Sequence, residues 1–424
     1  MTAQQQLQKI PVVVWQVLLM GLLGMTGIVF IPALARMVAP SLLASVLVAQ
    51  VFVYYLVLLT QYGFAWSGPA ALAQTVGDAE AATRVWRVSV RAKLLLLCGP
   101  VALASGVGYA YWADATPYVW VFAVLLLAYA LNSNWFVQAQ GDFVSGVLWV
   151  LLGLMVSAGG LALLWRGLPQ NGWVQNQGMV GAVVVAILVL PQSCLGVGSW
   201  WRARGMCVPH TVHRQTVSWQ EAICTLYKDA PFVVGQLLLL ASTTLGTMVV
   251  GALADAQTTA AYAATEKLFN LGATVLVGVY TALYPKFAKI YYQNRWVFWT
   301  QTRSLLGLTF VAGSLLMGML AWMGGPLLVL YVSSPLAERV VPVLLPFGFW
   351  LSLCLAQHVV TGYLVLAGRQ SQVLWLNGAV LGLTLVFGAA LASQNPIDWV
   401  YGMIAGQLLA IGWLVRCYVT DKDR

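Results

Sequence analysis

The sequence predicts an all-α polytopic membrane protein, with about twelve transmembrane helices arranged as two sets of six. Of the 424 residues, 61% are hydrophobic and 8% are charged, and the mean hydropathy is +0.83. A soluble domain carries about 25% charged residues, so this chain cannot cover a water-facing surface. Apolar runs of about 20 residues, the length that crosses a bilayer, recur along the whole chain.

Each predicted helix is an apolar run that lies between polar or basic segments. The first run follows Lys9 and lacks the small-residue cleavage site of a signal peptide, so it is expected to remain as a transmembrane helix. Tryptophans gather near the ends of many runs, as in the aromatic belts of membrane interfaces. The predicted helices cover residues 12–35, 41–64, 93–112, 117–138, 143–165, 178–200, 229–253, 259–284, 304–323, 340–362, 371–392 and 397–417.

The longest polar interruption, residues 201–228, follows the sixth run and separates two halves. We therefore expect a first six-helix bundle over residues 1–205, a cytoplasmic linker over 206–228 and a second bundle over 229–424. Division into two bundles is typical of transporters built from repeats.

The distribution of cations predicts the orientation in the membrane. With the N-terminus inside, 17 of the 21 Lys and Arg residues fall in cytoplasmic segments. Both termini are then cytoplasmic. The net charge of +9 thus reflects topology and affinity for anionic lipid headgroups rather than binding to nucleic acid.

Motifs for catalysis or cofactor binding are not found in the sequence. The six cysteines show no CxxC or metal-ligand spacing, and no GxSxG, HExxH or P-loop pattern stands in a suitable context. We expect no metal, no cofactor and no enzymatic activity. The short outward loops also speak against a membrane glycan polymerase or ligase.

Glu266 and Lys267 stand side by side in an otherwise apolar run. A charged side chain near the bilayer centre costs about 2.5–3.5 kcal/mol on insertion scales, which suggests a function for the pair. Helical spacing from Glu266 reaches Tyr262 and Asn270, and this stripe is consistent with a pore-lining face. The alternative is structural pairing near the periplasmic surface, where the lysine can snorkel.

Three stretches of the sequence carry a family resemblance: "QYGFAWSGPAALAQTVGDAEAATRVWRVSVRAK" (61–93), "AYAATEKLFNLGATVLVGVYTALYPKFAK" (261–289) and "GYLVLAGRQ" (362–370). They resemble Wzx-type O-antigen flippases, a polysaccharide-flippase branch of the multidrug/oligosaccharidyl-lipid/polysaccharide exporter superfamily. The second departs from the family pattern at Thr265, where alanine usually precedes Glu-Lys. With the twelve-helix layout, the resemblance spans nearly the whole chain.

The resemblance implies two six-helix bundles around a central cavity that opens alternately to each side. It also implies a substrate, an oligosaccharide on undecaprenyl pyrophosphate, which is moved to the periplasmic leaflet of a bacterial inner membrane. Membrane lipids, polysaccharide polymerase and chain-length proteins are the implied partners. The alternative is a multidrug or small-cation exporter of the same architecture, which the sparse acidic residues disfavour.

Two groups of residues are candidates for binding this substrate. The predicted cavity group consists of Arg36, Tyr54, Glu266, Lys267, Asn270 and His358. The predicted cytoplasmic group, for capture of pyrophosphate, consists of Arg84, Arg87, Arg91 and Arg369. Interfacial snorkelling, headgroup anchoring and interhelical hydrogen bonds are the structural alternatives for these residues. A proton-coupled step through Glu266 or His358 is a further hypothesis.

Overall fold

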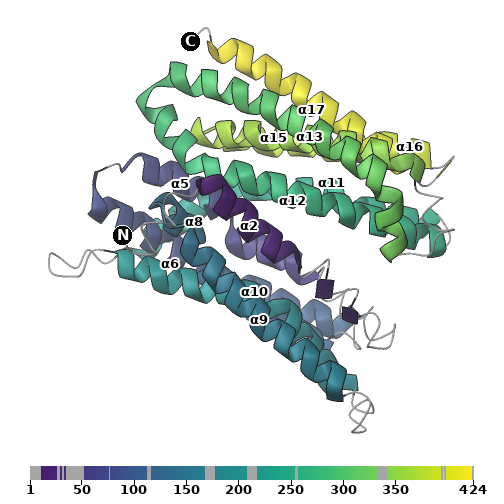
Figure 1. Cartoon of the computed structure of the whole chain (residues 1–424). Coiled ribbons are helices and arrows are strands. Elements are labelled where there is room, and N and C mark those ends of the chain that lie inside the picture. Colours follow the sequence, from purple (N-terminus) through teal and green to yellow (C-terminus); the bar gives the residue numbers. More distant parts are fainter. Residues whose placement is uncertain are drawn as a thin grey trace. The chain divides into compact units, whose positions relative to one another are not determined.

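The computed structural model describes residues 11–25, 29–30, 33–34, 52–75, 77–111, 116–167, 177–207, 217–253, 256–331, 341–392, 395 and 398–422. Within these ranges the chain is almost entirely helical and forms no strand (Figure 1). The predicted all-α class is therefore confirmed. Where described, every predicted run is mostly helical.

The chain divides into two compact units, residues 1–230 and residues 231–424. Besides a helix over residues 52–61, the first unit contains α2 (Val12–Met25), α5 (Phe64–Ala73), α6 (Ala79–Tyr111), α7 (Thr116–Leu131), α8 (Asn134–Ala139), α9 (Val144–Gly167) and α10 (Gln177–Met206). The second contains α12 (Ala256–Gln293), α13 (Arg295–Tyr331), η3 (Val341–Val343), α15 (Leu344–Leu366), α16 (Gln370–Ala392) and α17 (Trp399–Lys422).

Helix α11 (Trp219–Leu253) begins in the first unit and ends in the second. Pro231 lies inside this helix, directly after the boundary between the units. Because proline has no backbone N–H to donate, α11 lacks one helical hydrogen bond at this point. The boundary thus coincides with a weakened position of the helix.

Six helices in the described part of the chain are long and apolar enough to cross a membrane: Ala79–Gly106, Val144–Trp165, Val183–Met206, Trp219–Thr243, Leu344–Leu366 and Gln370–Ala392. Large apolar side chains are exposed along them, as in α9, where Leu148 is 59%, Met155 65% and Leu163 74% exposed. Such a surface is unfavourable in water but neutral against lipid tails. The protein is accordingly a polytopic membrane protein.

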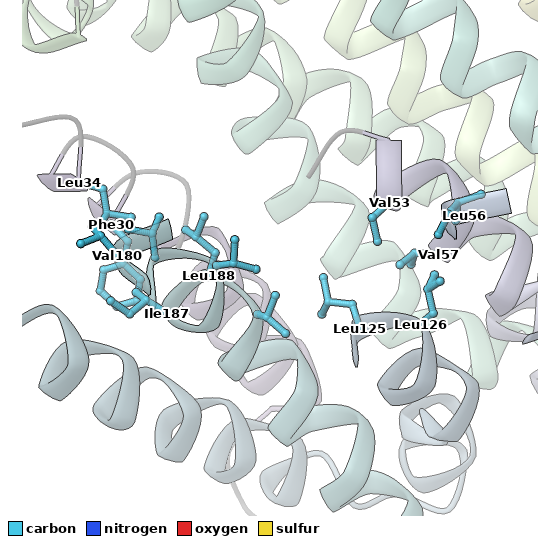
Figure 2. Packing of buried hydrophobic residues seen from close by; sticks show 14 residues of the cluster. Phe30, Leu34, Val53, Leu56, Val57, Leu125, Leu126, Val180, Ile187 and Leu188 are labelled. Atoms are coloured by element: carbon cyan, nitrogen blue, oxygen red, sulfur yellow. The ribbon is translucent and has the colours of Figure 1, made fainter. Parts of the chain in front are cut away.

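The core of the first unit is made of aliphatic side chains from helices that are distant in sequence. Figure 2 shows Val53, Leu56 and Val57 beside Leu125 and Leu126 of α7. Close helix approach in this unit depends on small residues, because a Cβ added to Gly196 of α10 would lie 2.2 Å from the carbonyl oxygen of Ala128.

The second unit is organised around α15, most of whose residues are buried and which packs against α12, α13 and α17. A chain of hydrogen bonds joins α15, α16 and α11 inside the unit. Gln357 Nε2 donates to Asn377 Oδ1 at 2.6 Å, and Asn377 Nδ2 donates to the carbonyl oxygen of Gly235 at 2.9 Å. Gln357 and Asn377 are both fully buried.

Several helix bounds differ from the prediction. Helices α11, α12 and α13 are longer than the predicted runs 229–253, 259–284 and 304–323, and α11 begins within the predicted linker. Two other differences have a local reason. Helix α6 begins at Ala79 rather than at residue 93, because Asp78 Oδ1 accepts from the backbone N–H groups of Glu80 (3.0 Å) and Ala81 (2.9 Å) and caps the helix. The predicted helix 117–138 is interrupted at Asn132 and Ser133. There, polar side chains bond to the nearby backbone in place of the helical ladder.

Candidate functional site

Helix α6 carries three arginines, Arg84, Arg87 and Arg91, on one face, which we call the arginine face. The sequence predicts a loop for this stretch, between the second predicted helix (41–64) and the third (93–112). Because α6 starts at Ala79, the spacing of three and then four residues places the guanidinium groups on one side of a helix. These three predicted capture residues therefore form one structural group, whose role in substrate capture stays a prediction.

Arg84 is engaged by the start of α11. Its Nε donates to Glu221 Oε1 at 3.0 Å and its Nη2 donates to Glu221 Oε2 at 3.1 Å. The arginine side chain is 54% exposed and the glutamate side chain 34% exposed. This is a two-pronged ion pair in contact with solvent, so water and salt weaken it.

Arg91 and Arg87 contact two described parts of the predicted linker 206–228. Arg91 Nη1 donates to the carbonyl oxygen of Val217, and its guanidinium carbon lies 5.3 Å from the centre of the Trp219 ring. Arg87 lies near the Cys207 thiol, at the end of α10. Burial raises the pKa of Cys207, while a hydrogen bond with Thr83 and the charge of Arg87 act in the opposite direction. The arginine face thus contacts the linker both at Cys207 and at residues 217–219.

The Tyr-Gly-Phe motif forms the turn beside this group. Tyr62 and Gly63 both have positive φ angles, 50° and 73°, which reverse the chain before α5. Left-handed backbone is rare for a residue such as tyrosine, so surrounding contacts must hold it. Phe64 is buried with Ala92 of α6 and Ala222 of α11, and Tyr62 packs against them. The motif therefore joins α5, α6 and the first turns of α11.

Lys93, one of the 17 cations expected in cytoplasmic segments, is buried in the first unit. It is 3% exposed, and its Nζ donates at 2.6 Å to the carbonyl oxygen of Asn132, in the break between α7 and α8. The carbonyl end of a helix attracts positive charge, so Lys93 satisfies the end of α7. The signal in the sequence was the polar run Asn132, Ser133 and Asn134 inside an apolar segment.

Ser133, in the same break, is also hydrogen-bonded. Trp86 Nε1 donates to Ser133 Oγ at 2.8 Å, and the backbone N–H of Ser133 donates to Ser199 Oγ at 3.1 Å. These bonds connect α6, the break and α10. Lys93 and Trp86 of α6 and Ser199 of α10 thus form a buried group of hydrogen bonds around the break.

In the second unit, Glu266 is 7% exposed on α12. Tyr262, one turn earlier, is fully buried, with its ring centre 5.3 Å from that of Phe347, and it lies close enough to Glu266 for electrostatic interaction. This face of α12 is turned toward packed side chains, which favours a structural contribution from Glu266. Its place in a substrate cavity stays a prediction.

Several predicted residues lie outside the part of the chain whose side chains are described. These are Arg36, Lys267 and Asn270. Tyr54 is half-buried in the first unit, where it interacts with Tyr129, whose hydroxyl donates to Gln192 Oε1. His358 Nδ1 lies 2.8 Å from the carbonyl oxygen of Cys354, one turn earlier in α15.

Arg369 follows the end of α15, where Gly368 has a φ angle of 71°. The Gly368 N–H donates to the carbonyl oxygen of Val365 and the Arg369 N–H to that of Leu364, which is the Schellman pattern of a helix C-terminus. The stretch 362–370 therefore ends α15. It also contacts α12, since Tyr292 Oη donates to the carbonyl oxygen of Leu366 at 3.2 Å.

Comparison with known proteins gives a family match and a fold match. A family model described as "Polysaccharide biosynthesis protein" matches residues 13–291. Among curated proteins, none matches. An outward-facing multidrug resistance MATE family transporter of the MOP superfamily is similar in structure, with a TM-score of 0.76, 15% identity, and coverage of 97% of this chain and 96% of that chain.

Two further solved structures show the same likeness. A MOP superfamily transporter from Pyrococcus furiosus, whose reversed binding-pocket polarity suggests a different function, gives a TM-score of 0.75 at 14% identity, covering 97% of this chain and 96% of that chain. A mutant MATE transporter from Vibrio cholerae gives 0.69 at 14% identity, with 97% of each chain covered. At these identities the likeness establishes the fold.

Proposed function

The chain belongs to the polysaccharide biosynthesis protein family, and on that premise we propose that it carries a lipid-linked oligosaccharide across a membrane. The proposed substrate is an oligosaccharide on undecaprenyl pyrophosphate. It passes from the cytoplasmic to the periplasmic leaflet of a bacterial inner membrane by alternating access, with both termini of the chain in the cytoplasm. The family match over residues 13–291 carries this proposal, because it reaches into both units.

The chemistry of this substrate fits the charges of the first unit. A polyprenyl tail can remain in the bilayer, but the pyrophosphate needs cationic donors. Arginine binds phosphate through paired N–H groups, and Arg84, Arg87 and Arg91 present such groups together on α6. The arginine face therefore suits the first contact with pyrophosphate on the cytoplasmic side.

A second candidate is a multidrug or small-cation exporter, which is favoured by the full-length likeness to MATE transporters. A site for cationic drugs needs buried carboxylates to balance their charge. Among the described residues, the buried acids are Asp229 and Glu266. The chain as a whole has 12 acidic residues among 424, and this small number disfavours a site for cationic drugs.

A strain that lacks the gene separates the two candidates. Loss of surface polysaccharide, with lipid-linked units retained in the inner leaflet, is expected, and the intact gene should restore display. Unaltered polysaccharide display together with increased sensitivity to cationic drugs would support the exporter instead.

A further inference from the structure

The start of α11 occupies the arginine face through three contacts. We call residues 217–221 the entry segment. Its Glu221 carboxylate accepts two hydrogen bonds from Arg84, its Val217 carbonyl oxygen accepts from Arg91, and its Trp219 ring lies over the same arginine. The segment thus offers the arginines a negative charge and oxygen acceptors, the same chemistry that a phosphate group would offer.

Two of the three contacts of the entry segment with the arginines lie at the surface. Trp219 is 54% exposed and the Glu221 side chain 34% exposed, whereas Val217 is 6% exposed and Ala222 is fully buried with Phe64 and Ala92. Solvent-exposed ion pairs are weak and screened by salt. The contacts of Trp219 and Glu221 with the arginines can therefore break while the side chains of Val217 and Ala222 remain buried.

We propose that the entry segment, a part of the same chain, binds the arginine face until phosphate groups of an anionic membrane lipid displace it. The identity of this lipid as the polyprenyl carrier rests on the proposed function, whereas the exchange itself rests on α6 and α11. Since α11 continues past Pro231 into the second unit, release of its first turn alters a helix that both units share.

A phosphate-bearing lipid has two advantages over Glu221 at this face. A phosphate carries more charge and more acceptor oxygens than one carboxylate, so it can bond to Arg84 and a second arginine at once. The half-exposed Trp219 ring is also a side chain typical of the headgroup level of a membrane. Both features favour a ligand that arrives along the membrane surface.

The test compares two charge-neutralising variants of the full-length protein in phosphatidylcholine nanodiscs, titrated with inorganic pyrophosphate at constant salt. Glu221→Gln removes the charge that pairs with Arg84. Asp142→Asn, the matched control, removes the same charge from another partly exposed ion pair of the first unit, in which Arg202 Nε donates to Asp142 Oδ2 at 2.7 Å and neither residue belongs to the arginine face. We expect Glu221→Gln to bind pyrophosphate about threefold to fivefold more tightly, and Asp142→Asn to bind it almost as the unmodified protein does.

Two more measurements complete the test. Adding Arg84→Gln to Glu221→Gln should abolish the gain in affinity. Saturating pyrophosphate, or undecaprenyl phosphate in the nanodisc, should speed amide hydrogen exchange over residues 219–226 in the unmodified protein. The same amount of phosphatidylglycerol should have a smaller effect, which would identify the carrier lipid rather than a general anionic headgroup as the source of the phosphate.

Equal affinity gains in Glu221→Gln and Asp142→Asn, or an unchanged rate of amide hydrogen exchange at saturating pyrophosphate, would overturn the proposed displacement. A response to phosphatidylglycerol equal to that with undecaprenyl phosphate would overturn the assignment to the carrier lipid. Transport is measured separately, so an affinity gain without transport counts against the proposed function alone.

Discussion

Replacing Asn377 with leucine should destabilise the second unit by an amount that its contacts define. The change removes an acceptor for Gln357 and a donor to Gly235. Hydrogen bonds between membrane helices contribute on average about 0.6 kcal/mol and at most about 1.7 kcal/mol. Leaving the buried Gln357 amide without this acceptor adds about 1–3 kcal/mol. The expected loss in the free energy of unfolding is therefore about 2–4 kcal/mol.

Equilibrium unfolding in mixed micelles of a mild detergent and dodecyl sulfate, followed by circular dichroism, measures this loss. Trp375→Leu is the control, since this side chain of the same helix is 72% exposed and its loss should change stability by less than about 0.5 kcal/mol. The double variant Asn377→Leu/Gln357→Leu should lose at least about 1 kcal/mol less free energy of unfolding than the two single variants lose together, because neither polar partner is then left unpaired. Strict additivity, or an Asn377→Leu loss no larger than that of the control, would refute the reasoning.

Three other changes test separate parts of the structure. Lys93→Met should lower the free energy of unfolding by about 1–3 kcal/mol in the same titration, because the buried Asn132 carbonyl oxygen loses its donor; an unchanged value would contradict this. Gly368→Ala should lower the free energy of unfolding by about 1 kcal/mol, since the φ angle of 71° disfavours a Cβ, and Gly368→Asn should lower it less. A thermal unfolding scan that ranks the two variants in the opposite order would count against the αL cap. Burial raises the pKa of Cys207 and the charge of Arg87 lowers it. Arg87→Gln should therefore move the pH midpoint of Cys207 alkylation upward and slow the reaction at neutral pH. A downward shift of the midpoint would disprove the contact.

The membrane class and the helices followed from the sequence because hydrophobic length is a strong local signal. Helices α9 and α16 lie within two residues of their predicted bounds. The start of α6 was misplaced because a hydropathy run ignores a polar helical extension, although Asp78 and Glu80 are typical of a helix N-terminus. Side-chain capping, not hydrophobicity, decides that end.

The candidate site was only partly predictable. The spacing of Arg84, Arg87 and Arg91 correctly suggested one face. Their contacts with Val217, Trp219 and Glu221 could not be deduced, because they join residues more than a hundred positions apart. The role of Lys93 at the helix break was missed for the same reason, since the break and the lysine lie on different helices.

The most direct test of the proposed function is transbilayer movement in liposomes that contain the purified full-length protein and an undecaprenyl-pyrophosphate-linked oligosaccharide. Periodate, which oxidises sugars and does not cross the membrane, reports the fraction of glycan on the outer surface. We expect protein-containing liposomes to expose inner-leaflet glycan continuously until nearly all of it has reacted. Oxidation that stops when the outer leaflet is exhausted, as in protein-free liposomes, would contradict the proposed function.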